Sequence, residues 1–211
     1  MAEHFRYLRR FVAAPARIGS VAPSSQSLAR AMLRGIDWDA TGVVAELGAG
    51  TGVFTQAVVG ALAPDARFLV FETEPALRRD LLRRFPSLEL HEDAATLGAT
   101  LAAGGLDGAD CIISGLPFAN FRPLVRQKLL RAIFGALRPG GVFVGFQYST
   151  QLRRELRACF GAVETEVVLR NVPPAVVYRC RRQPLDALHG LPGDAPAVDA
   201  GAPVMAARAA D

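Results

Sequence analysis

Acidic residues stand at the ends of three apolar runs in the first half of the chain, and a glycine-rich segment follows the first run. Glu46 lies in that run, just before Gly48-Ala49-Gly50-Thr51-Gly52. Glu72 ends the second run, 20 residues after the glycine motif, and Asp93 follows the third. Glycines allow a tight turn and leave room for a ligand against the main chain. An acid at the end of the second strand accepts hydrogen bonds from ribose hydroxyls. These residue types and spacings predict a nucleoside-binding site.

The carboxylate of Glu46 bears on which nucleoside is bound. A strand, a glycine loop and a helix can hold a pyrophosphate at the helix N-terminus, but an adjacent carboxylate would repel it. The same carboxylate suits the cationic end of S-adenosylmethionine, with Glu72 on the ribose and Asp93 on the adenine amine. Taken alone, Glu46 or Glu72 could be a solvated acid at a strand end. The residues predicted to bind the cofactor are Glu46, Gly48, Gly50, Thr51, Gly52, Glu72, Thr73, Asp93, Ala94 and Ser114.

A second candidate site follows the fourth apolar run, at Gly115-Leu116-Pro117-Phe118. Backbone carbonyls of a proline-containing loop can accept hydrogen bonds from an amine, and an aromatic ring can hold a developing cation. Tyr148, at the end of the fifth run, is a second aromatic residue at the same predicted edge. We predict that Leu116, Pro117, Phe118 and Tyr148 form the acceptor site of a methyl transfer. The alternatives are a core-facing Leu-Pro-Phe turn and a buried tyrosine, and no residue is assigned as a general base.

Alternating strands and helices position both sites. Their spacing predicts an α/β, Rossmann-like fold with a mostly parallel seven-stranded sheet and helices on both faces. The predicted strands are 43–47, 67–72, 88–91, 109–114, 142–148, 163–170 and 175–181, the last two forming an antiparallel hairpin through Asn171-Val172-Pro173-Pro174. The predicted helices are 26–33, 51–63, 75–85, 123–137 and 152–160, the fourth stopped by Arg138-Pro139-Gly140-Gly141.

Residues 3–12 predict a short amphipathic helix. Its apolar arc contains Phe5, Tyr7, Leu8, Phe11 and Val12, and its basic arc contains Arg6, Arg9 and Arg10. Such a helix is too short and too charged to span a bilayer but can lie in its interface, where each arginine contributes ~1 kcal/mol near an anionic leaflet. Packing of the apolar arc on the core is the alternative. We divide the chain into a segment 1–35, a cofactor-binding domain 36–183 and a disordered tail 184–211 rich in Ala, Pro and Gly.

The amino-acid composition bears on the class of protein and on its cellular compartment. Hydrophobic residues make up 51% and charged residues 21%, as in a globular protein, and the net charge of +4 fits an anionic partner. We recognise no secretory signal and no apolar run of the roughly 18 residues that a transmembrane helix needs. Cys111, Cys159 and Cys180 are widely spaced, so neither a zinc site nor a disulfide framework is predicted. We expect a cytoplasmic protein.

Several segments together resemble the bacterial phospholipid N-methyltransferases and their ornithine-lipid N-methylating relatives. They are the basic helix, Gly19-Ser20-Val21-Ala22-Pro23-Ser24-Ser25, the glycine motif with Glu46, Gly115–Phe118, Phe146–Ser149 and Asn171–Arg179. The resemblance spans roughly residues 5–182. It implies a class I S-adenosylmethionine-dependent methyltransferase that converts phosphatidylethanolamine and its mono- and dimethyl forms toward phosphatidylcholine. It also implies peripheral association of the N-terminal helix with the inner face of the cytoplasmic membrane.

The sequence leaves three other functions open. An rRNA adenine N6-dimethyltransferase shares the glycine motif and a Leu-Pro-aromatic loop, and it would explain the basic charge. Gly115 replaces the polar first residue of the adenine-directed loop, however, so nucleic acid is the less favoured partner. A non-catalytic membrane-binding module on the same fold is the second, and a methyltransferase for another amine or for a protein is a third.

Overall fold

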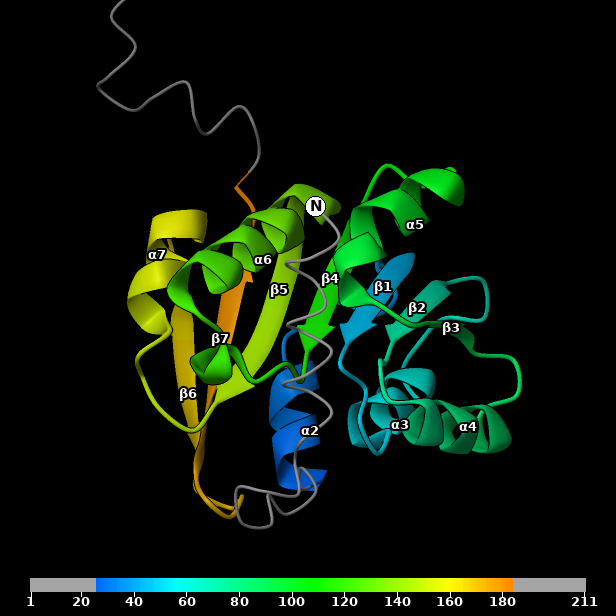
Figure 1. Cartoon of the computed structure of the whole chain (residues 1–211), viewed down its shortest axis with the longest axis horizontal. Helices are drawn as coiled ribbons and strands as arrows, with labels where there is room; N and C mark the ends of the chain where they lie inside the picture. The colour runs from blue at the N-terminus through cyan, green and yellow to red at the C-terminus, as the bar shows by residue number, and fades with distance from the viewer. Residues whose placement is uncertain (1–25, 184–211) are drawn as a thin grey trace, which may run out of the picture.

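The computed structural model describes residues 26–183 and contains a seven-stranded sheet in the order β3-β2-β1-β4-β5-β7-β6, with helices on both faces (Figure 1). The strands are β1 Val43–Leu47, β2 Arg67–Phe71, β3 Glu89–His91, β4 Ala109–Ser114, β5 Leu137–Gln147, β6 Glu164–Val168 and β7 Ala175–Arg181. The helices are α2 Gln26–Leu33, α3 Val53–Val59, α4 Pro75–Arg84, α5 Leu97–Ala103, α6 Pro123–Ala136 and α7 Arg153–Phe160, with 3₁₀ turns η2 Ala94–Thr96 and η3 Phe118–Asn120. The predicted fold class is confirmed, whereas the predicted helix 3–12 and tail 184–211 lie outside the described residues.

The centre of the sheet is parallel, which explains its apolar strands. β1 pairs in parallel with β2 on one side and β4 on the other, and all five of its residues are buried. A parallel strand covered on both faces is a nearly continuous apolar run, so Glu46 is the exception within β1. Leu47 is in register with Phe71 and with Ser114. The ends of β1, β2 and β4 therefore meet at one edge, the carboxyl edge of the sheet.

The C-terminal hairpin extends the sheet beyond β5. β7 is antiparallel to both β5 and β6 and lies between them, so the outermost strand is β6. Gln147, the last residue of β5, is in register with Val176 near the start of β7. This register brings the turn between β6 and β7 to the carboxyl edge, at the lower end of the sheet in Figure 1.

The largest differences from the predicted elements concern α3, β5 and α5. α3 is confined to Val53–Val59, because Gly52 before it has a φ of 78° and Gly60 caps its end. β5 begins at Leu137 and not at Val142, since Arg138-Pro139-Gly140-Gly141 ends α6 yet continues as an irregular stretch of strand beside β4. α5 was not predicted, because its sequence Leu-Gly-Ala-Thr-Leu-Ala-Ala carries only a weak amphipathic pattern.

α2 packs into one of the hydrophobic clusters that cover the sheet. Leu28 and Met32 are fully buried in a cluster with residues of β1, α3, β4 and β7. Arg34 forms an ion pair of 2.6 Å with Glu166 on β6. The described part of the predicted segment 1–35 is thus packed on the sheet. Within residues 26–183, no helix has the length and apolar character needed to cross a membrane.

Candidate cofactor and acceptor site

The glycine motif is held against the end of β2. Gly48 and Ala49 donate backbone hydrogen bonds to the Phe71 carbonyl at 2.8 and 3.2 Å. Gly48, Gly50 and Gly52 all have positive φ values, of 75°, 57° and 78°, a region that glycine enters without steric cost. A Cβ atom at Gly50 would meet no atom within 4 Å. The loop therefore turns sharply and leaves an open face at Gly50.

Glu46 is fully buried directly below this loop. Its Oε2 accepts a hydrogen bond from Thr55 Oγ1 at 2.7 Å, whereas Oε1 has no hydrogen-bond partner. Burial raises the pKa of Glu46 to about 7, opposed by the hydrogen bonds from Thr55 and reinforced by the nearby Glu72 carboxylate. A buried carboxylate in this state favours a cationic ligand.

Glu72 also lies buried at this edge, just beyond the end of β2, with 2% of its surface exposed. Its Oε2 accepts from the backbone N–H of Gly50 at 2.7 Å, and its Oε1 accepts from that of Glu74 at 2.9 Å. Each carboxylate oxygen can accept a further hydrogen bond. Next to it, the buried Thr73 Oγ1 has no hydrogen-bond partner. The site thus joins fixed acceptors to an unused hydroxyl, which is what a ribose requires.

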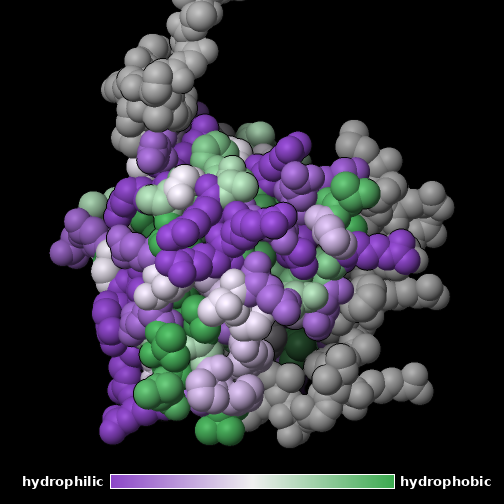
Figure 2. Space-filling model, turned by 90° about the vertical axis from the view of Figure 1, so that its left-hand side faces the viewer, coloured by the Kyte–Doolittle hydropathy of each residue, from purple (hydrophilic) through white to green (hydrophobic). Residues whose placement is uncertain are grey.

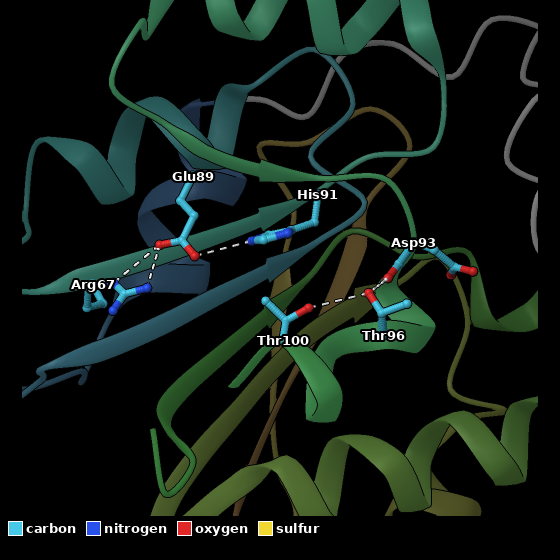
Figure 3. A network of polar contacts seen from close by, with 6 residues as sticks. All are labelled: Arg67, Glu89, His91, Asp93, Thr96 and Thr100. Atoms are coloured by element: carbon cyan, nitrogen blue, oxygen red, sulfur yellow. Dashed lines mark hydrogen bonds and ion pairs between the residues drawn. The ribbon is translucent and has the colours of Figure 1, made fainter. Parts of the chain in front are cut away.

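A polar network fixes the end of β3 (Figure 3). Arg67 on β2 donates to Glu89 Oε2 at 3.2 Å from Nε and 2.8 Å from Nη2, and His91 Nε2 lies 3.4 Å from Glu89 Oε1. Asp93 caps the 3₁₀ turn that follows, because its Oδ1 accepts from Ala95 N at 2.9 Å. These contacts hold Asp93 and the start of η2 at the carboxyl edge, beside the end of β2.

These residues fit S-adenosylmethionine. Its positively charged sulfonium and ammonium groups would offset the negative charge of Glu46 and Glu72. Its ribose hydroxyls would form hydrogen bonds with Glu72 and Thr73. Within residues 26–183, no group of three or more His, Cys, Asp or Glu side chains is arranged to hold a metal ion.

The acceptor loop lies against the glycine motif. Gly115 N donates to the Leu47 carbonyl at 2.9 Å, and a Cβ atom at position 115 would lie 2.6 Å from the Gly48 carbonyl oxygen. A side chain at 115 would therefore force the two loops apart. Glycine is therefore the residue that this close approach of the two loops requires. Ser114, fully buried, uses its Oγ to accept from Leu116 N at 3.2 Å.

Gln147 was not predicted as a site residue, yet it connects the end of β5 to the acceptor loop. Its Nε2 donates to the Leu116 carbonyl at 3.1 Å, and its Oε1 accepts from Ala119 N at 3.2 Å. Arg126 on α6 supports the same loop, because it forms a bidentate ion pair with Glu155 and points Nη1 at the carbonyls of η3. A lone glutamine or arginine has no local sequence signature for such a role.

Comparison with known proteins shows the family to which the chain belongs. No protein-family profile matches it. An ornithine lipid N-methyltransferase from Singulisphaera acidiphila is 34% identical over 186 residues, which cover 86% of this chain and 97% of that protein. The chain belongs to this lipid N-methyltransferase family. It is therefore an S-adenosylmethionine-dependent methyltransferase, and the predicted cofactor and family are confirmed.

Solved structures agree on the fold of this family member. The N-methyltransferase NodS from Bradyrhizobium japonicum WM9, in complex with S-adenosyl-L-homocysteine, superposes with a TM-score of 0.60 at 16% identity, covering 85% of this chain and 98% of that one. Human methyltransferase-like protein 13, also with S-adenosyl-L-homocysteine, gives a TM-score of 0.55 at 19% identity over 76% of this chain and 80% of that one. At these identities the likeness shows the class I methyltransferase fold and no more.

Most of the residues predicted to bind the cofactor lie together, and Thr51 differs from them in being exposed. The structure brings Glu46, Glu72, Thr73, Asp93 and the glycines to the carboxyl edge, as expected, with Ala94 buried in η2 behind them. Thr51 is exposed, and its carbonyl accepts from Arg84 Nη1 at 2.6 Å. The roles of these residues in this lipid N-methyltransferase stay predictions.

The two aromatic residues of the predicted acceptor site have different surroundings. Phe118 is completely buried, and its ring packs edge-on against Phe121 and Phe143 at centroid distances of 6.0 and 6.2 Å. It is a core residue that anchors the acceptor loop, and not the open ring that the predicted cation contact requires. Tyr148 is 40% exposed and stands edge-on to Phe146. It lies just beyond β5, at the carboxyl edge, and its role in binding an acceptor stays a prediction.

Proposed function

We propose that the protein transfers methyl groups from S-adenosylmethionine to the amine of a membrane aminolipid. The observation that carries this proposal is the match to an ornithine lipid N-methyltransferase along 97% of that protein's length. Phosphatidylethanolamine, with its mono- and dimethyl forms on the way to phosphatidylcholine, is the substrate that the sequence motifs favour. Ornithine lipid is the substrate that the relative's name favours. Both present a primary amine beside a membrane surface.

The chain's own residues would act mainly by alignment. S-adenosylmethionine supplies an activated methyl group, which the lipid amine takes by in-line displacement as its nitrogen–carbon bond forms and the carbon–sulfur bond breaks. Glu46 and Glu72 hold the cofactor, and the contact between Gly48 and Gly115 brings the acceptor loop beside it. Backbone carbonyls of the loop orient the amine by accepting hydrogen bonds from its N–H groups. Such alignment can account for a large part of a methyl-transfer rate.

The acceptor loop offers no acid or base of its own. Residues 114–121 read Ser-Gly-Leu-Pro-Phe-Ala-Asn-Phe and contain no side chain that titrates near neutral pH. A primary amine attacks only when it is neutral, so its proton leaves to water or through a loop carbonyl. This neutral, proline-containing loop is suited to an amine and offers a nucleobase no side chain to pair with at position 115. The chain described after β5 holds only α7 and the β6–β7 hairpin, with no helical RNA-binding domain.

Membrane association is part of the proposal. The arginine-rich helix predicted at 3–12 lies outside the described residues, and its sequence fits an anionic leaflet on the cytoplasmic side. Docking there would bring an aminolipid headgroup to the enzyme without extracting the lipid into water.

The test is a pair of lipid extracts. The chain is expressed in one bacterial host that makes phosphatidylethanolamine but no phosphatidylcholine, and in another that also makes ornithine lipid. Mass spectrometry should find mono-, di- or trimethylated forms of one of these lipids. The variant Glu72→Ala, which loses the ribose acceptor, should produce none and should show no heat of S-adenosylmethionine binding in calorimetry. Cofactor binding without any methylated lipid in either host would show that the acceptor is a different amine.

A further inference from the structure

The turn between β6 and β7 gathers exposed apolar side chains. Seven large hydrophobic residues are exposed within the described part of the chain. Three of them, Val59, Leu82 and Leu124, are spread over three helices. The other four lie in or beside one hairpin: Tyr148 at 40%, Val167 at 60%, Leu169 at 75% and Val172 at 77% exposure. Exposed apolar residues are ordinary when scattered, but a cluster marks an interaction surface.

Figure 2 shows this surface from the side formed by α7 and β6. Hydrophobic groups (green) gather at the lower end, where the hairpin turns, beneath a largely hydrophilic face. We call this end, formed by Val167, Leu169, Val172 and Tyr148, the hairpin tip. It lies at the carboxyl edge, because Gln147 at the end of β5 pairs with Val176 at the start of β7. The hairpin tip therefore faces the same way as the acceptor loop.

The turn has a fixed shape. Asn171 is only 2% exposed, and its Nδ2 donates to the Pro173 carbonyl at 2.8 Å. The Asn171 side chain also hydrogen bonds Tyr148. Asn171 thus turns inward while its neighbours Leu169 and Val172 turn outward. A preformed apolar end can insert into a partner without first losing conformational entropy.

The charge of the hairpin tip points to the kind of partner. Residues 167–174 contain Arg170 and no acidic residue. The acidic residues of β6 are Glu164 and Glu166, and Glu166 pairs with Arg34 at 2.6 Å and with Arg179 at 3.1 Å. Apolar side chains, an amphipathic tyrosine and an arginine that forms no ion pair within residues 26–183 are the composition of a segment that enters the bilayer interface.

We propose that the hairpin tip is a membrane-docking element, with Leu169 and Val172 inserted among the lipid headgroups. The inference rests on the proposed lipid substrate, and it adds a second membrane contact to the one proposed for residues 3–12. Insertion sets the carboxyl edge against the bilayer, so the amine of a membrane lipid meets the acceptor loop directly. The contact is apolar and therefore persists at high salt, where attraction between surface charges is screened.

The test uses the full chain and vesicles of phosphatidylethanolamine and phosphatidylglycerol. The variant Leu169→Ser/Val172→Ser should lower partitioning onto these vesicles about tenfold at high salt, because two aliphatic side chains no longer leave water. The matched control Leu82→Ser/Val59→Ser removes the same two residue types from α4 and α3. Both lie on helices beside β1–β3, at the other end of the strand order from the β6–β7 hairpin (Figure 1), so the control should bind vesicles like wild type.

Two further measurements separate this inference from the proposed function. Vesicle binding is measured without turnover, so it stands even if no lipid is methylated. If lipids are methylated, the hairpin variant should show a raised KM for vesicle lipid and an unchanged rate on a short-chain aminolipid dissolved as monomers. Wild-type vesicle binding by the variant, or equal loss by the control, would overturn the inference. So would a loss of self-association in solution with vesicle binding unchanged, which would make the hairpin tip a protein contact.

Discussion

Glu46 is a buried carboxyl group that forms no ion pair within residues 26–183. Thr55 gives it one hydrogen bond, Oε1 has none, and Glu72 lies nearby with the same charge. Burial raises the pKa of Glu46 from 4.5 to about 7. The folded chain therefore holds a proton that the unfolded chain releases between these pH values. The contribution of this residue to the free energy of unfolding is greatest below pH 4.5 and falls as the pH rises toward 7. A bound cationic cofactor would offset the cost of burying the ionised carboxylate.

The variant Glu46→Gln tests this account at the level of one residue. Without cofactor, it should raise the free energy of unfolding at pH 8 by up to about 3 kcal/mol, with the gain shrinking toward pH 5. Urea unfolding at the two pH values measures the difference. The same variant should show no S-adenosylmethionine binding in calorimetry. Glu164→Gln, an exposed change on β6, is the control. An equal effect of Glu46→Gln at both pH values would show that the carboxylate is not strained by burial.

At the scale of elements, the acceptor loop is positioned by a neighbouring strand. Gln147 bonds both the Leu116 carbonyl and the Ala119 N–H from the end of β5, while Ser114 bonds within the loop. We infer that Gln147 is a positioning residue, because it holds the loop whose carbonyls would orient the amine. Loss of a buried donor leaves the Leu116 carbonyl without this hydrogen bond, at a cost of about 1–3 kcal/mol.

The variant Gln147→Glu removes that donor while keeping the size of the side chain. We expect kcat to fall about tenfold at pH 8, a loss equivalent to about 1.4 kcal/mol, with S-adenosylmethionine affinity within about twofold of wild type. A carboxylic acid at position 147 donates only when protonated, so the loss relative to wild type should shrink toward pH 6. Gln151→Glu, an exposed change near the same loop, serves as the control. A pH-independent loss would assign Gln147 a purely structural role.

Local patterns were enough to predict most elements but not all of the site. β1 and β4 were predicted because buried parallel strands are apolar runs, and Glu46 and Glu72 were predicted because acids at the ends of such runs are conspicuous. The roles of Phe118 and Gln147 depend on residues distant in sequence. Phe118 is buried by Phe143, and Gln147 reaches Leu116 only because β4 and β5 are adjacent. No window of sequence contains that information.

At the scale of the whole molecule, charge and apolar surface are divided between different parts of the chain. Residues 1–34 hold six arginines and one acidic residue, so the rest of the chain carries a formal charge of −1 out of the total of +4. The apolar hairpin tip, by contrast, is formed by Tyr148, Val167, Leu169 and Val172. Attraction to an anionic membrane should therefore come from the N-terminal residues, and insertion from the hairpin tip.

Reversing three arginines separates these two contributions. The variant Arg6→Glu/Arg9→Glu/Arg10→Glu changes the formal charge from +4 to −2, at two units for each residue. At low salt it should cosediment with anionic vesicles at least about a hundredfold more weakly, since each arginine contributes ~1 kcal/mol. At high salt it should differ little from wild type. The control Arg79→Glu/Arg131→Glu/Arg154→Glu makes the same charge change at exposed positions on α4, α6 and α7. If the control lost as much binding as the N-terminal variant, net charge alone would explain the attraction, and residues 3–12 would have no special role at the membrane.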